Sequence, residues 1–255
     1  MAQAFRPANA GLKPRATVSN RLHNTRMSTT TPSLQICRDC GGGAPVAVHF
    51  CPQCTKILSL GRHGDYFAFL GLPRRLALET AEIERRFRAL SRQFHPDFFY
   101  NATPAERMAS LERSSYLNDA YRTLRDPVTR LQYLLQIEGF SPAGPAEASR
   151  QVPPSLLEEV FALNEEIDQV RTARAGGAPA TVWQGRLERA RGPIEARRVE
   201  HETQLQELAA RWDTLADRPH DEAGRRAVLR ALADRFLERI YITNLLAGIE
   251  RELNS

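Results

Sequence analysis

All four cysteines of this 255-residue chain fall in one short segment, and their arrangement constrains the fold more than any other sequence feature. The spacing is Cys37-x2-Cys40-x10-Cys51-x2-Cys54. Two intervening residues let the thiolates of each pair converge on one ion, and the glycines at 41–43 let the backbone curl toward it. Because four thiolates leave no open position for water, we expect a structural metal site rather than a catalytic one.

Zinc is the metal that this tetrad predicts, as one ion bound by all four cysteines. Iron in a rubredoxin-like site and a redox-active dithiol pair remain alternatives. His49 could replace one ligand, but four thiols already complete a tetrahedral site. Residues 34–62 are too few to bury a stable core alone, so we expect metal binding to supply most of the folding free energy of this zinc-binding module.

The distribution of charge limits the classes of partner. The composition is globular, with 42% hydrophobic and 25% charged residues, and 35 basic residues against 30 acidic ones give a net charge of +5. Five basic residues and no acidic ones lie in the first 36 positions: Arg6, Lys13, Arg15, Arg21 and Arg26. The rest of the chain is therefore neutral, which argues against nucleic acid or an anionic membrane as a partner. Apolar runs are also too short to span a bilayer.

The first 33 residues have the composition of a targeting segment. They contain arginine and many small and hydroxyl residues, and they lack both acids and the apolar core of a secretory signal. We expect a transit peptide that directs the protein to the mitochondrial matrix. A chloroplast transit peptide and a disordered tail with a chance charge bias are the alternatives.

A basic amphipathic helix is predicted from Ala81 to Phe94, with Thr80 as its N-cap. Its apolar residues recur at helical spacing, whereas Arg85, Arg88 and Arg92 lie on the opposite face. This stripe is either a solvated face or a surface that attracts an acidic partner. The tripeptide His95-Pro96-Asp97 ends the helix, because a proline disfavours helical conformation at the residue before it. A second helix is predicted for residues 104–125.

The C-terminal region is predicted to be a three-helix bundle. Its first helix has a bundle-facing seam with 4,3,4,3 spacing, made of Leu156, Val160, Leu163, Ile167 and Val170. Leu157 and Phe161 lie outside this seam, so they either pack under a neighbouring helix or form a partner-binding patch. Two further helices are expected over 181–216 and 220–253, with Trp183 and Trp212 as packing residues. The predicted fold class is therefore all-α.

Residues 65–127 resemble the J domain of DnaJ-type co-chaperones. The similarity consists of Asp65-Tyr66-Phe67 to Leu72, the basic helix, the His95-Pro96-Asp97 tripeptide and the run Leu117-Asn118-Asp119-Ala120-Tyr121 that continues to Asp126-Pro127. A catalytic His/Asp pair is the rival interpretation of the tripeptide, but no nucleophile, second acid or phosphate-binding glycine loop accompanies it.

One branch of this family, the HscB-type iron–sulfur co-chaperones, resembles the chain from Asp65 to the C-terminus. The similar segments include YFAFLGLP at 66–73, RQFHPD at 92–97 and RLQYLL at 130–135. Mitochondrial members also carry a cysteine tetrad ahead of the J domain. The chain departs from the family in its linker and in an arginine-rich surface whose lysines are Lys13 and Lys56 only, so charged contact residues do not carry over directly.

The resemblance implies an adaptor without enzyme activity. It implies that His95, Pro96 and Asp97, with Arg85, Arg88 and Arg92, engage a DnaK-type heat-shock chaperone and stimulate its ATPase. It also implies that an iron–sulfur cluster scaffold protein binds Leu157, Phe161 and a third aromatic residue, which aligns with Phe236 and has Tyr241 as a competitor. The expected domains are a transit peptide (1–33), the zinc-binding module (34–62), a J-domain helical hairpin (64–139), a linker (140–154) and a scaffold-binding domain (155–255).

Two alternative functions remain open at this point. A general J-domain co-chaperone for unfolded clients would share the J-domain residues and lack the scaffold site. A zinc-ribbon protein that binds nucleic acid through a helical dimerisation domain is favoured by the isoelectric point near 9.3 and opposed by the neutral charge of residues 37–255.

Overall fold

The structure is a computed structural model that describes residues 34–60, 65–140, 153–218 and 220–255. The expected transit peptide and nearly all of the expected linker at 140–154 lie outside the described residues. The described part is mostly helical, as predicted, and its strands are confined to the segment that holds the cysteines. None of the described helices combines the length and the apolar character that a bilayer span needs.

The N-terminal module is built on a two-stranded antiparallel hairpin of β1 (Leu34–Ile36) and β2 (Gly43–Pro45), with Gln35 opposite Ala44. A single bridge between Phe50 and Ile57 closes the second loop. The hairpin loop carries the first cysteine pair, and the second loop carries the other pair. A small buried cluster lies between them and consists of Cys37, Ala44, Cys51 and Leu58.

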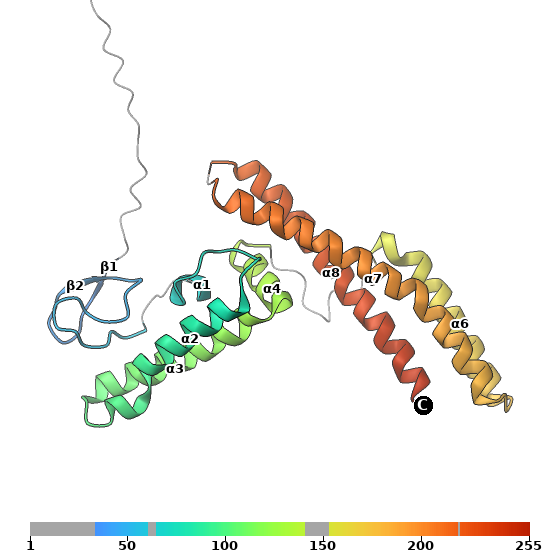
Figure 1. Ribbon diagram of the computed structural model, residues 1–255, viewed down its shortest axis with the longest axis horizontal. Coiled ribbons are helices and arrows are strands. Elements are labelled where there is room, and N and C mark those ends of the chain that lie inside the picture. The colour runs from blue at the N-terminus through green and yellow to red at the C-terminus, as the bar shows by residue number, and fades with distance from the viewer. Residues whose placement is uncertain (1–33, 61–64, 141–152, 219) are drawn as a thin grey trace, which may run out of the picture. The chain divides into compact units, whose positions relative to one another are not determined.

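The J-domain region begins with α1 (Tyr66–Phe69) and is dominated by an antiparallel pair, α2 (Thr80–Phe94) and α3 (Pro104–Arg125), which lie side by side in Figure 1. A 3₁₀ turn, η1 (Pro96–Phe99), connects them, and α4 (Pro127–Ile137) follows α3. The predicted bounds of α3 are confirmed. The predicted N-cap of α2 is wrong by one position, because the helix already includes Thr80 and the residue before it, Glu79, makes no capping hydrogen bond with its side chain.

The start of α3 explains its sharp boundary. Thr103 accepts a hydrogen bond from the backbone N–H of Glu106, and the Glu106 carboxylate accepts one from the backbone of Thr103. This reciprocal capping box satisfies donors that a helix start leaves unpaired. Pro104 occupies the first helical position, where a missing N–H costs nothing.

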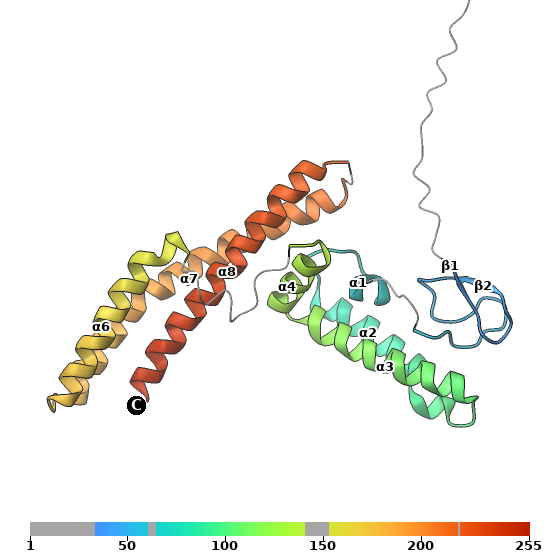
Figure 2. The ribbon, with the colours of Figure 1, turned by 180° about the vertical axis from the view of Figure 1, so that it is seen from behind.

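The C-terminal region is the predicted three-helix bundle. After the short 3₁₀ turn η2 (Pro154–Leu156), it consists of α6 (Leu157–Ala175), α7 (Ala180–Ala216) and α8 (Glu222–Leu253), which pack together as Figures 1 and 2 show from opposite sides. The predicted seam of α6 is buried at Leu156, Leu163 and Val170. Trp183 packs in the same cluster, as expected.

The far halves of α7 and α8 pack against the J-domain region instead of against α6. Trp212 of α7 and Leu232 and Phe236 of α8 belong to one apolar core together with Phe67, Leu117 and Leu134. Trp212 is therefore a packing residue, as predicted, but the core that it joins includes J-domain residues as well as residues of its own bundle. Burial of large aromatic and branched side chains on this scale is the main force that holds the two regions together.

Candidate functional site

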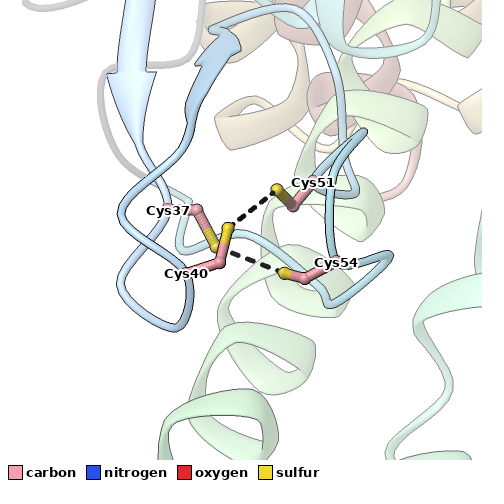
Figure 3. A group of neighbouring side chains, drawn as sticks. All are labelled: Cys37, Cys40, Cys51 and Cys54. Carbon is pink, nitrogen blue, oxygen red and sulfur yellow. Dashed lines mark hydrogen bonds between the residues drawn. The ribbon is translucent and has the colours of Figure 1, made fainter.

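The four cysteines converge as the spacing predicts. Their sulfur atoms all lie within 4.8 Å of one another, and Figure 3 shows the side chains pointing toward a common centre. The Sγ atoms of Cys37 and Cys54 are 3.7 Å apart, as are those of Cys40 and Cys51. A tetrahedral ion with bonds of about 2.3 Å to sulfur requires sulfur–sulfur edges of about 3.8 Å. These two distances match that edge, and the whole tetrad is compact enough to surround one tetrahedral metal ion.

The backbone around Cys51 favours its thiolate form. Hydrogen bonds from the backbone N–H groups of Cys54 and Gln53 lower the pKa of Cys51 to about 7. The turn after the first pair requires a left-handed residue, and Gly41 provides it with φ of +70°. The peptide N–H of Cys37 then bonds to the carbonyl of Gly42, which closes the loop around the site.

The His95-Pro96-Asp97 tripeptide forms an exposed loop at the end of α2. The side chains of His95 and Asp97 are 53% and 86% exposed. His95 Nδ1 accepts a hydrogen bond from the backbone N–H of Asp97 (3.4 Å), and this bond shapes the start of the 3₁₀ turn. With most of their surface in solvent, both side chains are available to a partner. Phe98 and Tyr100 lie beside them and are also exposed, a feature that we did not anticipate from the sequence.

The basic face of α2 is exposed as predicted, but its charges are unevenly balanced. Arg85 makes two hydrogen bonds of 2.7 Å to Glu82, and Arg88 makes one of 2.6 Å to Glu84. Within the described residues, Arg92 forms no ion pair. Among these three arginines, Arg92 therefore carries the least compensated positive charge. It lies in the last turn of α2, next to the tripeptide.

Arg113 on α3 is a functional candidate that sequence reasoning missed. Its side chain is fully buried, and it reaches across to the cysteine module. It donates to the carbonyls of Leu58 (2.7 Å) and Ser59 (3.1 Å), and its Nη1 lies 2.7 Å from His49 Nδ1. Burial lowers its pKa to about 10, so it stays charged at neutral pH. Its spacing from Leu117, Ala120 and Leu124 places it on the buried stripe of α3, and this was the available signal.

His49 is held by this arginine and is not a fifth metal ligand. Burial, followed by the charge of Arg113, lowers the pKa of His49 to about 4. The neutral ring accepts from Arg113 through Nδ1 and packs edge-on against Phe69 and Phe94, with centroids 4.8 and 4.9 Å away. The expectation that His49 stays outside the metal site agrees with the cysteine-only cluster.

The three expected scaffold contacts do not form one surface. Leu157 and Phe161 lie on the outer side of α6 and are 39% and 69% exposed, so they do not pack under another helix. Phe236, however, is only 4% exposed and belongs to the core that α7 and α8 share with the J-domain region. Its role as the third scaffold contact stays a prediction, and the burial of its side chain does not favour it. Its competitor Tyr241 is also buried, within the core of the bundle.

The surroundings of the exposed pair are polar. Phe161 borders a shallow groove of about 810 Å³ along α6, whose lining includes Glu165, Asp168 and Arg186. At the start of α6, Ser155 Oγ donates to the buried carboxylate of Glu238 (2.6 Å), which anchors the turn that precedes Leu157. The pair is thus presented by a fixed helix end.

Comparison with known proteins agrees with this arrangement. Residues 65–133 match the family described as the DnaJ domain. The structure is similar to the human co-chaperone protein HscB, with a TM-score of 0.59 and 22% identity over 85% of this chain and 98% of that chain. Chaperone HscB from Vibrio cholerae matches with a TM-score of 0.49 and 26% identity, over 74% of this chain and 96% of that chain.

Residues 65–133 therefore form a DnaJ domain, with the His95-Pro96-Asp97 loop exposed on it. The chain has the fold of the human co-chaperone protein HscB. In this chain the cysteine module precedes the DnaJ domain and the C-terminal helical bundle follows it. The DnaJ domain and the HscB-like fold expected from the sequence are both confirmed.

Proposed function

We propose that this protein is a co-chaperone that stimulates the ATPase of a DnaK-type heat-shock chaperone and delivers an iron–sulfur cluster scaffold protein to it. The observation that carries the proposal is the solvent-exposed His95-Pro96-Asp97 loop at the end of an arginine-lined helix, in a chain with the HscB fold. The protein acts by binding two partners at once and performs no chemistry itself.

Chaperone docking uses the tripeptide together with the basic face of α2. Exposed positive charge speeds encounter with an acidic surface, and the loop provides the specific contacts. Arg92 carries the largest share of the steering, since Arg85 and Arg88 are already paired with glutamates of the same helix. His95 and Asp97 then contact the chaperone directly.

Scaffold binding uses Leu157 and Phe161. Large apolar side chains that stay exposed on a rigid helix are suited to become interface anchors. The acidic residues of the groove beside Phe161 favour a partner with basic groups around its apolar contact. Phe236 has no place in this surface.

The cysteine module holds one structural zinc ion. The sulfur geometry fits zinc, and the closed four-thiolate set leaves no open coordination position for catalysis. The basic, acid-free N-terminal segment directs the protein to the mitochondrial matrix, where the segment is removed.

One binding and activity experiment tests the proposal. The purified chain is mixed with a DnaK-type chaperone, and ATP hydrolysis is measured with and without the cluster scaffold protein. We expect stimulation by the chain alone, and tight binding of the scaffold but not of an unfolded peptide or duplex DNA at physiological salt. Preference for the unfolded peptide would identify a general J-domain protein, and preference for DNA would overturn the proposal.

A further inference from the structure

The cysteine module and the chaperone-binding loop meet at one residue, Phe94, the last residue of α2. The ring of Phe94 lies 4.9 Å from His49 and 6.1 Å from Phe50, both in the module, and the Arg113 guanidinium lies 5.7 Å from its centroid. His95 follows Phe94 directly in the chain. The residue whose ring packs on the module therefore also forms the base of the loop.

The backbone of Phe94 is fixed from the other side by α3. Its carbonyl accepts hydrogen bonds from Ser110 Oγ (2.6 Å) and Ser114 Oγ (3.0 Å). A carbonyl at a helix C-terminus has no partner within its own helix, so these serines complete the end of α2. Ser110 and Ser114 flank Arg113 on the same helix, which brings the module contacts and the loop base onto a single turn of α3.

Arg113 depends on the folded module for its hydrogen bonds. Three groups of the module, the carbonyls of Leu58 and Ser59 and the ring of His49, receive its donors. No carboxylate neutralises this guanidinium within the described residues. A buried charge without such partners is strongly unfavourable. When the module loosens, the Arg113 side chain must leave its position over Phe94 and reach solvent.

We infer that Arg113 is a positioning residue for chaperone stimulation. When the cysteine module is folded around its metal, Arg113 stays packed over Phe94. This contact holds the His95-Pro96-Asp97 loop in its binding geometry. The inference rests on the proposed function of that loop. It gives the module a role in the co-chaperone cycle, because metal occupancy then governs how well the protein engages the chaperone.

The test removes the metal from the full-length protein with a chelator and follows two quantities. Hydrogen–deuterium exchange of residues 94–100 reports on the loop without any chaperone present. Titration of the protein into an ATPase assay gives the maximal stimulation and the concentration for half-maximal stimulation. We expect faster exchange of the loop and a half-maximal concentration raised about fivefold or more, with maximal stimulation preserved. General unfolding would instead reduce the maximal stimulation and the helical circular dichroism.

Two variants of Arg113 and one control variant test whether Arg113 is the connection. Arg113→Gln should raise the half-maximal concentration in the metal-loaded protein, and chelation should then add little, because the coupling is already lost. Arg122→Gln on the exposed side of α3 serves as the matched control and should respond to chelation as the wild type does. Arg113→Lys keeps the positive charge but loses the planar, forked guanidinium. Its half-maximal concentration should therefore lie between those of the wild type and Arg113→Gln.

The outcomes separate this inference from the proposed function. If the metal-loaded wild-type protein fails to stimulate any DnaK-type chaperone, the proposed function is wrong, and the exchange data still decide the coupling. If stimulation is normal but chelation leaves both loop exchange and the half-maximal concentration unchanged, the coupling does not exist. If Arg113→Gln responds to chelation as fully as Arg122→Gln, Arg113 is not the residue that transmits it. If Arg113→Gln does not fold, chelation of the wild type still decides whether the coupling exists, and the response of Arg113→Lys, compared with that of Arg122→Gln, decides whether Arg113 transmits it.

Discussion

The Asp213 carboxylate of α7 accepts a hydrogen bond of 2.7 Å from the backbone N–H of Leu76, in the segment between α1 and α2. The other carboxylate oxygen accepts one of 2.8 Å from Ala77. Next to it, Trp212 Nε1 donates to the carbonyl of Arg74 (3.2 Å). Side chains of the bundle thus complete the backbone hydrogen bonds of a J-domain loop that lacks secondary structure, which joins the two regions by directional contacts as well as by apolar burial.

Asp213→Ala should destabilise the protein by about 1–3 kcal/mol, because it leaves two backbone N–H groups without their charged acceptor. Asp217→Ala is the matched control. It removes a 2.7 Å ion pair with Arg75 whose side chains are 64% (Asp217) and 40% (Arg75) exposed, and it should cost less than about 1 kcal/mol. Denaturant unfolding of both variants measures the difference. A loss for Asp213→Ala no larger than that for Asp217→Ala would contradict the predicted strength of the Asp213 hydrogen bonds.

Metal analysis of the purified protein should find about one zinc ion per chain, and Cys51→Ser should abolish tight binding. The variant should lose the fold of residues 34–60 and show a lower melting temperature. Most of the helical circular dichroism should remain, because the core around Phe67, Leu117 and Leu134 lies outside the module. Some loss of stability is still expected, since Ile57 of the module is buried in that same core. Iron in place of zinc in reduced protein would contradict the prediction.

His95→Gln and Asp97→Asn should each abolish stimulation of the chaperone ATPase and leave the melting temperature nearly unchanged. Both side chains are mostly in solvent and contribute little to the core. The hydrogen bond between His95 Nδ1 and the Asp97 N–H is long, so its loss affects folding little. Stimulation assays alongside thermal unfolding test this directly, and near-normal stimulation by both variants would remove these residues from the docking surface.

Arg92→Ala should weaken chaperone docking more than Arg85→Ala. The Arg85 charge is already compensated by two hydrogen bonds to Glu82, whereas Arg92 has no such partner within the described residues. The difference should shrink as ionic strength rises, because exposed charges are screened by salt. Half-maximal stimulation measured at low and high salt tests the order. A salt-independent effect of Arg92→Ala would show that it acts through packing instead of steering.

The helices could be predicted from the sequence because their signals are local. The bounds of α3 follow from Thr103, Glu106 and two prolines, and the cysteine site follows from spacing alone. The role of Arg113 could not be predicted in the same way. Its place on the buried stripe was visible, but an arginine is normally assigned to the surface, and only its partners in the distant module make burial favourable.

The burial of Phe236 depends on tertiary packing that periodicity does not contain. The spacing of apolar residues in α8 indicates a broad apolar band with Phe236 toward one side. This spacing does not predict which element covers that side. The band is divided between two cores, one with α6 and one with the J-domain region, and Phe236 falls in the second. Leu157 and Phe161 were predictable to the extent that a narrow seam excluded them, and the structure leaves them exposed.

Leu157→Ala with Phe161→Ala should weaken binding of the cluster scaffold protein at least tenfold, since truncation of an apolar anchor commonly costs about 1 to 4 kcal/mol of binding free energy. Stability should change little, because both side chains are substantially exposed. Phe236→Ala should do the opposite: its buried ring lies in the core with Trp212 and Leu232, so its loss should cost about 3–5 kcal/mol of folding free energy. Calorimetric titration with the scaffold and thermal unfolding separate the two effects. Unchanged scaffold affinity in a well-folded double variant would exclude this surface, whereas lost affinity in a stable Phe236→Ala protein would restore Phe236 as a contact.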